Sequence, residues 1–228
     1  LSEQFDQLLY RYPMIKFLEN PVYNEANNIS SALVARYLLS NAYVFEADLL
    51  ISNPAIIKKY HYTSDFLAIK KDRTDDWCFE VKNGVIVEQK VGGLDCWQMV
   101  GISYWNEEDG HKLSQDIPEV YGTPGGKERY WEQVPLVYRK DHYAVEVMEC
   151  FDEDIVEIDT FRELNHRMGK LWSQVELQAS PELLELLNLY KVCRADMDLL
   201  MQKDRFKVGF RLGIQLLTEA TGLKKIDL

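Results

Sequence analysis

Apolar positions in the first 172 residues form short runs that alternate with segments of helical spacing. Runs of strand length, bounded by turn residues, predict strands at residues 14–18, 43–51, 66–69, 96–105 and 143–151. Apolar spacing near 3.6 residues predicts helices at about 29–39, 107–119 and 127–138, and further helices that begin at Asn53-Pro54 and at Thr160. This alternation of strands and helices predicts an α/β fold with a mixed sheet.

Turn and capping residues predict a hairpin and the start of one helix. Asn83-Gly84 separates the apolar runs 78–81 and 85–91. A tight hairpin turn needs two residues with positive φ, and Asn-Gly supplies them, so a β-hairpin is predicted here. Asn28 or Ser30 stands where the 29–39 helix needs a side chain to cap its free N–H groups.

The pattern changes after Trp172, where the strand signals stop. Long amphipathic helices are predicted at about 181–201 and 205–220, and Gly222 is a suitable stop for the second. We therefore expect an α/β domain at 1–172, followed by a helical extension at 173–228. Apolar stripes on such helices ordinarily serve packing or self-association, so a homo-oligomer formed through this extension is the expected role.

Composition and charge narrow the class of protein. With 228 residues and 46% hydrophobic positions, the chain can bury a sizeable core. The net charge of −11 argues against a general nucleic-acid binder, because such affinity depends on basic residues that displace counterions from phosphates. There is no CxxC pair, no leading secretory segment and no apolar run near the roughly 20 residues that cross a bilayer. We expect a soluble, cytoplasmic protein that does not associate with membranes.

Two carboxylates follow apolar segments and are candidate metal ligands. Asp48 closes the sequence Val-Phe-Glu-Ala-Asp, and Asp159 closes Ile-Val-Glu-Ile-Asp just before a predicted helix. Strand ends converge on the ligand crevice of an open α/β sheet, and Mg²⁺ accepts one or two carboxylates beside water and phosphate oxygens. The alternative is structural: Asp159 would help to cap a helix, and Asp48 would be an acid in a turn.

Three aromatic residues form a second candidate set. Trp77, Tyr130 and Trp131 have acidic neighbours, among them Glu132. Aromatic faces attract quaternary ammonium groups, and a carboxylate adds complementary charge, so these residues could form a cage for a choline-like cation. The alternative is that the rings belong to the core, where large aromatic residues are common.

Other signatures of chemistry are missing from the sequence. Residues 122–127, Gly-Thr-Pro-Gly-Gly-Lys, do not have the spacing of a nucleotide-binding P-loop. The four histidines make no zinc motif, and there is neither a GxSxG elbow nor a paired-glycine dinucleotide fingerprint. Serine hydrolases and Rossmann dehydrogenases are therefore excluded.

Several modest motifs, taken in order, resemble the bacterial CTP:phosphocholine cytidylyltransferases, a branch of the sugar-nucleotide pyrophosphorylase-like nucleotidyltransferases. The resemblance covers about residues 3–172, and its specificity lies in the order of the motifs. They are Asn-Pro-Val-Tyr at 20–23 with Asn-Asn-Ile-Ser-Ser-Ala-Leu at 27–33, Tyr-Val-Phe-Glu-Ala-Asp at 43–48, Asp-Trp at 76–77, Val-Gly-Ile-Ser-Tyr-Trp at 100–105, Tyr-Trp-Glu-Gln at 130–133 and Glu-Ile-Asp at 157–159.

The resemblance implies a Rossmann-like nucleotidyltransferase fold and a role for each candidate residue. Asp48 and Asp159 would be catalytic and would hold Mg²⁺ on the nucleotide phosphates. Asn28 and Ser30 would lie near the nucleotide, and the substrate pocket for choline would be lined by Trp77, Tyr130, Trp131 and Glu132. The implied reaction is attack by the phosphate of phosphocholine on the α-phosphorus of CTP, which gives CDP-choline and pyrophosphate.

The sequence departs from this family at its beginning. The family starts with a strand and a glycine-rich loop that holds the nucleotide through backbone N–H groups, followed by a lysine, whereas no glycine here precedes Gly84. We expect either a piece of a longer protein or a paralogue without that segment, and poor turnover of CTP by the chain as given. Two alternatives therefore remain open: a non-catalytic module that binds choline-like cations or oligomerises, and a hexose-1-phosphate nucleotidyltransferase.

Overall fold

A computed structural model describes residues 8–197, 199–200 and 203. The chain divides into two compact units, Leu1–Asp159 and Thr160–Leu228. Helix α4, Phe161–Gln178, belongs to the second unit and runs without interruption across residue 172. All the motifs listed above lie in the first unit.

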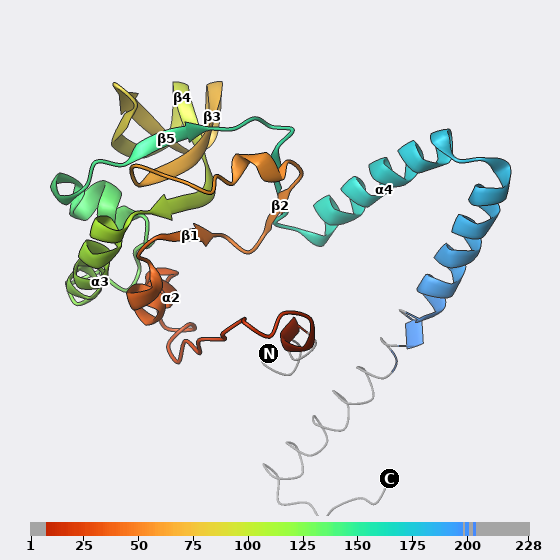
Figure 1. Ribbon diagram of the computed structural model, residues 1–228, viewed down its shortest axis with the longest axis horizontal. Coiled ribbons are helices and arrows are strands. Elements are labelled where there is room, and N and C mark those ends of the chain that lie inside the picture. Colours follow the sequence, from red (N-terminus) through yellow and green to blue (C-terminus); the bar gives the residue numbers. More distant parts are fainter. Residues whose placement is uncertain (1–7, 198, 201–202, 204–228) are drawn as a thin grey trace, which may run out of the picture. The chain divides into compact units, whose positions relative to one another are not determined.

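The main sheet of the first unit is mixed, as the sequence predicts. In the described residues it has four strands in the order β1-β4-β3-β5, and Figure 1 shows their arrangement. β3 pairs with β4 antiparallel and with β5 parallel, and β1 pairs with β4 antiparallel. The strand bounds are Ala42–Phe45 for β1, Asp65–Lys82 for β3, Val85–Trp105 for β4 and Glu146–Glu149 for β5.

The predicted hairpin is confirmed and is longer than expected. Asn83 and Gly84 have φ values of 53° and 85°, and β3 and β4 are its arms. The separate runs 66–69 and 78–81 belong to one strand, and 85–91 and 96–105 belong to the other. Register shifts interrupt the ladder, one of them between Thr74 and Trp77. Because a bulge redirects the side chains beside it, this shift affects how Trp77 is presented.

A second, two-stranded sheet joins distant parts of the chain. β2, Leu49–Ile51, pairs antiparallel with β6, Ile155–Glu157, with Leu49 opposite Glu157 and Ile51 opposite Ile155. The apolar segment 43–51 is thus not one strand: it leaves the main sheet after Phe45 and enters this ribbon at Leu49. The acidic residues of the segment lie at this change of sheet.

Helices cover one side of the main sheet. α2, Ile29–Ala35, continues as the 3₁₀ turn η1, Arg36–Leu38, and contacts α3, Glu107–Tyr121, beside it (Figure 1). The helix predicted at Asn53-Pro54 is the short 3₁₀ turn η2, Pro54–Ile56, which the Asn53 side chain caps. Two further short helices are η3, Val134–Tyr138, which is π-helical, and the 3₁₀ turn η4, Lys140–His142.

The beginning of β3, residues 65–69, is buried on both faces of the sheet. Successive strand residues point to opposite sides, so they enter two different apolar clusters. Phe66 and Ala68 pack into one apolar cluster together with Leu113 and Ile117 of α3. Leu67, the residue between them, packs into a second cluster on the opposite face. The second cluster also contains Ile56, Ile69, Val100, Ile102, Cys150 and Ile155.

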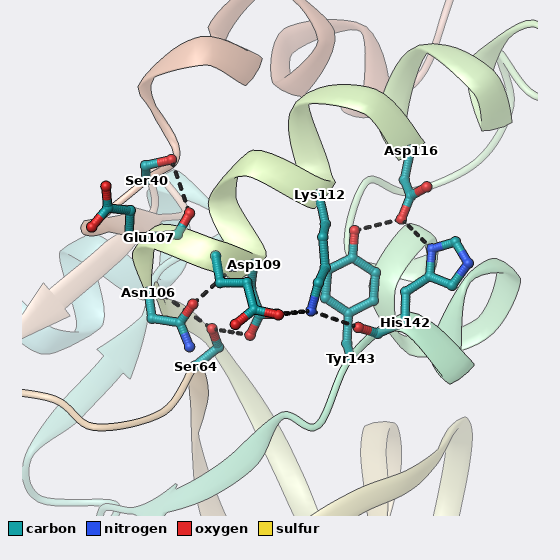
Figure 2. A network of polar contacts seen from close by, with 10 residues as sticks. Ser40, Ser64, Asn106, Glu107, Asp109, Lys112, Asp116, His142 and Tyr143 are labelled. Carbon is teal, nitrogen blue, oxygen red and sulfur yellow. Dashed lines mark hydrogen bonds and ion pairs between the residues drawn. The ribbon is translucent and has the colours of Figure 1, made fainter.

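A polar network fixes α3 to the edge of this core (Figure 2). The Asn106 side chain accepts from the Asp109 backbone N–H and caps the helix, and buried Ser64 donates to the Asp109 carboxylate at 2.7 Å. About two turns further along, the Tyr143 hydroxyl donates to Asp116 at 2.6 Å, and the same carboxylate contacts His142. Because each buried carboxylate has partners, the helix can bury both acids without a large desolvation cost.

Two predicted elements are wrong, and hydrogen bonding explains the second. Residues 14–18 form no strand and Met14 is 88% exposed, so this apolar run has no sheet to join. In the predicted helix 127–138 only residues 134–138 are helical. Backbone groups of Lys127 and Trp131 bond instead to Asn27 and Asn28, at 2.7 and 2.8 Å. These bonds to the start of α2 replace the helical ones.

The second unit is helical in its described part. Thr160 and Glu163 form a reciprocal capping box at the start of α4, as expected for a helix that opens at Thr160. Residues 181–197 and 199–200 are also helical. The helix predicted at 205–220 lies outside the described residues. No helix in the described ranges has both the length and the apolar character that crossing a membrane requires.

Candidate functional site

A cavity of about 760 Å³ opens in the first unit and gathers most of the candidate residues. That volume lies within the range typical of small-molecule sites. Asn28, Asp48, Trp77, Tyr130, Trp131, Glu132 and Asp159 all line it. They come from the start of α2, the β1–β2 connection, β3, the segment before η3 and the end of β6. Folding thus brings together residues that are up to 131 positions apart in the sequence, from Asn28 to Asp159.

Ser30 is the exception among the predicted site residues. It is buried and is not among the residues that line the cavity. Its hydroxyl accepts from the Asn20 side chain at 2.9 Å and donates to the Asn27 carbonyl at 2.8 Å. In this structure Ser30 therefore links Asn20 and Asn27, which precede α2, to the first turn of that helix. Its neighbour Ser31 lines the cavity.

The β2–β6 ribbon brings the two acidic segments together. Glu157 is paired with Leu49, and the Ile158 N–H donates to the Asp48 carbonyl at 2.9 Å. On the other side, the Glu46 N–H donates to the Gly101 carbonyl at 3.0 Å, which ties the same segment to β4. Short backbone ladders therefore fix the positions of both acidic segments at the cavity wall.

Carboxylates from these segments form a cluster that suits a cation. One oxygen from each of Glu46, Asp48 and Glu157 lies within 4.8 Å of the others. Asp159 lines the same cavity but is not a member of this three-residue group. Glu46 and Glu157 were not predicted as ligands, although each stands two residues before a predicted aspartate in the repeated pattern Glu-x-Asp.

Burial and the charges of neighbouring carboxylates raise pKa values within this cluster. Burial, followed by the charges of Glu132 and Asp48, raises the pKa of Glu46 to about 7. Burial, followed by the charges of Asp159 and Asp48, likewise raises the pKa of Glu157 to about 7. Like charges held close together disfavour ionisation, and a bound cation would relieve that repulsion.

The donor set fits Mg²⁺. Magnesium takes oxygen ligands at about 2.0–2.1 Å, so that ligand oxygens on opposite sides of the ion are about 4.2 Å apart. The ligand atoms of the cluster lie within 4.8 Å of one another, which is close to that separation. All of its ligand atoms are carboxylate oxygens, which is the chemistry that a hard cation prefers.

The aromatic residues divide into two kinds. Trp77 and Tyr130 meet edge to face, with ring centroids 5.7 Å apart, and Tyr130 is 40% exposed. The Trp131 ring is instead 7% exposed and packs against Phe66 and Trp105, with centroids at 6.3 and 5.8 Å. Trp77 and Tyr130 form the aromatic wall of the cavity, whereas Trp131 belongs mainly to the core.

Asn28 holds this wall in place. Its side-chain oxygen accepts from the backbone N–H of Trp131 at 2.8 Å. Asn28 makes no side-chain cap to α2, so the capping role predicted for it is wrong. Glu132 is 2% exposed, and its Oε2 atom has no hydrogen-bond partner in the described part of the chain. Burial raises the pKa of this carboxyl group as well.

Comparison with known proteins finds clear relatives, although no family model matches the chain. The chain is 33% identical over 171 residues to a 2-aminoethylphosphonate cytidylyltransferase of Lancefieldella rimae, a match that covers 72% of this chain and 68% of the relative. It is 25% identical over 174 residues to a choline-phosphate cytidylyltransferase of Haemophilus influenzae, with 75% and 74% covered.

A solved structure shares the fold. The CTP:phosphocholine cytidylyltransferase of Streptococcus pneumoniae superposes with a TM-score of 0.67 at 23% identity, and the match covers 75% of each chain. The sheets and helices described above are therefore those of a nucleotidyltransferase, which confirms the predicted fold class.

Proposed function

Because this chain belongs to the bacterial CTP:phosphocholine cytidylyltransferase-like nucleotidyltransferases, we propose that it transfers CMP from CTP to a small phosphorylated acceptor that carries an amino group. The acceptor class is phosphocholine, a related phosphorylated amino alcohol, or an aminophosphonate. The observation that carries the proposal is the meeting of an acidic cluster and an aromatic wall in one cavity.

The bond changes of the proposed reaction are simple. An oxygen of the acceptor's phosphate or phosphonate attacks the α-phosphorus of CTP, and the bond from that phosphorus to the oxygen bridging to the β-phosphate breaks. Pyrophosphate leaves with the bonding electrons. Such a transfer depends mainly on positioning and on neutralising charge, so that no covalent intermediate with the protein is required.

Residues of the acidic cluster would supply the metal site. Asp48 and Glu157, with Glu46 beside them and Asp159 on the same wall, would hold Mg²⁺. When bound there, the ion would neutralise negative charge on the nucleotide phosphates. The carboxylates alone would repel those phosphates, because six acids line the cavity in the described part of the chain: Glu46, Asp48, Asp76, Glu132, Glu157 and Asp159.

The aromatic wall would hold the acceptor. Trp77 and Tyr130 present ring surface to the cavity, and Asp76 lines it beside them. A cationic group is attracted both to ring faces and to carboxylates, so this wall would orient the acceptor with its amino end at the rings. Asn28 would act indirectly, by fixing the segment that carries Tyr130 and Glu132.

An assay for pyrophosphate release tests the proposal. The chain is incubated at high concentration with CTP, Mg²⁺ and either phosphocholine, phosphoethanolamine or 2-aminoethylphosphonate, so that slow turnover is detected. We expect release that needs both the acceptor and Mg²⁺, and that Asp48→Asn lowers at least 100-fold. Asp95→Asn is the matched control, because Asp95 is exposed on the hairpin and pairs with Lys70.

Two results would contradict the proposal. Release supported by a hexose 1-phosphate but by none of the three amino acceptors would assign the chain to the sugar branch. Binding of choline compounds with no dependence on CTP or Mg²⁺ and with no release would instead identify a non-catalytic cation-binding module.

A further inference from the structure

Strand β3 has a bulge directly before Trp77, one of the two rings of the aromatic wall. The pairing of β3 with β4 shifts between Thr74 and Trp77, where two residues of β3 lie opposite one residue of β4. Such a two-to-one arrangement bends the strand and changes the direction of nearby side chains. The opposite residue, Gly92, has a φ of +74°, a backbone conformation that glycine adopts without strain.

The bulge allows two consecutive residues to reach the cavity. In a regular strand, consecutive side chains point to opposite faces of the sheet. Asp76 and Trp77 nevertheless both line the cavity. The Asp76 carboxylate also acts on the acidic cluster: after burial and other carboxylates, its charge contributes to raising the pKa of Glu46 and of Glu157. The local backbone conformation of β3 therefore decides which of its groups face the cavity.

One buried hydroxyl holds the bulge in this conformation. Thr74 is 9% exposed, and its hydroxyl oxygen accepts from the backbone N–H of Asp76 at 3.2 Å. The same hydroxyl donates to the side-chain oxygen of Gln98 on β4 at 3.0 Å. A hydroxyl has one hydrogen to donate and lone pairs that accept, so Thr74 makes both bonds at once. It thereby joins the bulge to the neighbouring strand at the point where the register is interrupted.

A second bond continues this chain of contacts toward the aromatic wall. The backbone N–H of Trp77 donates to Oδ1 of Asp76 at 2.7 Å. Two successive backbone N–H groups of the bulge are thus bound by side chains of the bulge itself, the first by Thr74 and the second by Asp76. Threonine and aspartate side chains commonly stabilise turns in this way, in place of ladder bonds. Loss of the Thr74 hydroxyl would release the first of these groups.

From this geometry we infer that Thr74 is a positioning residue of the candidate site: its hydroxyl fixes the bulge that turns Asp76 and Trp77 into the cavity. Thr74 is not among the residues that line the cavity, so it acts through these two neighbours and does not touch a ligand. The inference rests on the proposed function, since it concerns the wall that would hold the acceptor. The acidic cluster, not this wall, would serve the nucleotide phosphates, so acceptor binding should depend on Thr74 and nucleotide binding should not.

Isothermal titration calorimetry on the full chain tests the effect on the acceptor. Phosphocholine and 2-aminoethylphosphonate are titrated with Mg²⁺ and a non-hydrolysable CTP analogue present, and the analogue is titrated separately. Thr74→Val removes the hydroxyl but keeps a β-branched side chain that suits a strand. We expect it to weaken acceptor binding about 3- to 10-fold, the range for one lost neutral hydrogen bond, and to leave the affinity for the CTP analogue within about 2-fold.

Two further variants identify the hydroxyl as the cause. Thr74→Ser keeps the hydroxyl and should restore acceptor affinity to within about 2-fold of that of the unaltered chain. Thr63→Val is the matched control, because it removes a hydroxyl from a half-buried threonine that does not line the cavity. It should leave both affinities unchanged.

A structural measurement gives an answer that depends neither on turnover nor on binding. In a ¹⁵N-labelled chain, the indole N–H resonance of Trp77 is assigned with Trp77→Phe. Thr74→Val should shift this resonance more than those of the other tryptophans, whereas Thr74→Ser should leave it in place. Gln98→Leu removes the partner of the same hydroxyl on β4 and should also shift the Trp77 resonance, so the inference can be tested even if Thr74→Val fails to fold.

The outcomes separate this inference from the proposed function. Unchanged acceptor affinity in Thr74→Val, or an equal loss in Thr63→Val, would overturn the inference and leave the cytidylyltransferase proposal intact. Equal losses of affinity for the acceptor and the CTP analogue would indicate a general effect on the fold and would overturn it as well. If the unaltered chain binds neither acceptor, the proposed function fails, and the Trp77 resonance alone decides whether Thr74 holds the bulge.

Discussion

Gly101 leaves the space that the Glu46 carboxylate occupies in the acidic cluster. Its φ is +67°, and a Cβ added there would overlap Oε2 of Glu46. A residue with a side chain would thus face both an unfavourable backbone conformation and a clash with the acidic cluster. The absence of one side chain, in the middle of a strand, leaves room for the carboxylate.

We predict that Gly101→Ala destabilises the protein by about 1–2 kcal/mol through backbone strain, and that the added methyl group displaces the Glu46 side chain. The substitution should also weaken binding of Mn²⁺, used as a spectroscopic substitute for Mg²⁺, at least 10-fold. Urea unfolding and electron paramagnetic resonance measure the two effects. Gly125→Ala is the control, because Gly125 has a similar φ of +72° but nothing within 4 Å of the added atom. Equal effects from both variants would contradict the role of the Glu46 contact.

The acidic cluster gives a pH dependence of defined sign. The pKa values of Glu46 and Glu157 rise from 4.5 in the unfolded chain to about 7 in the folded one. Protonation of these groups therefore favours folding, so their contribution is complete below about pH 4.5 and is lost as the pH rises through 7. In metal-free buffer, the double variant Glu46→Gln/Glu157→Gln should lack this loss.

Thermal melting of the two proteins between pH 5 and 8 measures the difference. The melting temperature of the double variant should exceed that of the unaltered chain increasingly as the pH rises. Mg²⁺ should raise the melting temperature of the unaltered chain alone, because a ligand stabilises only the state that binds it. A constant difference across this pH range would show that the two glutamates are not coupled to folding in this way.

At the level of single residues, local patterns predicted part of the site and long-range contacts decided the rest. The acid at position 48 could be found because it follows an apolar run. The role of Asn28 could not, because the Trp131 N–H that it binds is 103 residues away and no local pattern reports such a contact. Likewise the burial of Trp131 depends on Phe66 and Trp105, which are distant in sequence.

Among the elements, the β2–β6 ribbon matters most for the site, because it positions both acidic segments. Ile155 is 5% exposed, opposite Ile51, and anchors β6 to the core two residues before Glu157. We predict that Ile155→Ala lowers stability by about 2–5 kcal/mol, as is usual when a buried aliphatic side chain is shortened. It should weaken Mn²⁺ binding at least 5-fold as well, because β6 holds Glu157.

Ile56→Ala provides the comparison for this variant. Ile56 lies in the same apolar cluster and is 7% exposed, but it belongs to η2, which carries no ligand. It should cost similar stability and leave Mn²⁺ affinity within about 2-fold. Titration at a temperature where both variants are fully folded separates the effects, and equal losses of affinity would mean that β6 has no specific role.

Elements that local turn residues or periodicity specify could be predicted from the sequence. Elements whose structure depends on contacts with distant segments could not. The Asn83-Gly84 turn and α3 follow from turn chemistry and periodicity, and both are confirmed. The segment 127–132 has helical spacing, yet its backbone bonds the start of α2 instead. Similarly, the apolar run 43–51 gives no indication that it serves two different sheets.

At the scale of the whole molecule, self-association remains a prediction. Apolar residues of α4 are exposed at intervals of three and four: Phe161, Leu164, Met168, Leu171 and Val175. This is the spacing of a coiled-coil seam, which a second copy of the chain would cover. Sedimentation velocity should therefore show a dimer at micromolar concentration.

Leu171→Glu should shift that dimer toward monomer by at least 10-fold in the dissociation constant. Gln174→Glu adds the same charge at an exposed position off the seam, so it should leave the assembly unchanged. A monomer for the unaltered chain at all concentrations would show the prediction to be wrong.

The ribbon between residues 49–51 and 155–157 also determines when the cavity can exist during folding. Its two strands are separated by about a hundred residues, and closing so long a loop comes late, after local turns and helices have formed. The hairpin and α3 can form before the acids meet. A cation or nucleotide held by those acids would therefore have little to bind in the transition state. It should slow the unfolding of the native protein without hastening its folding.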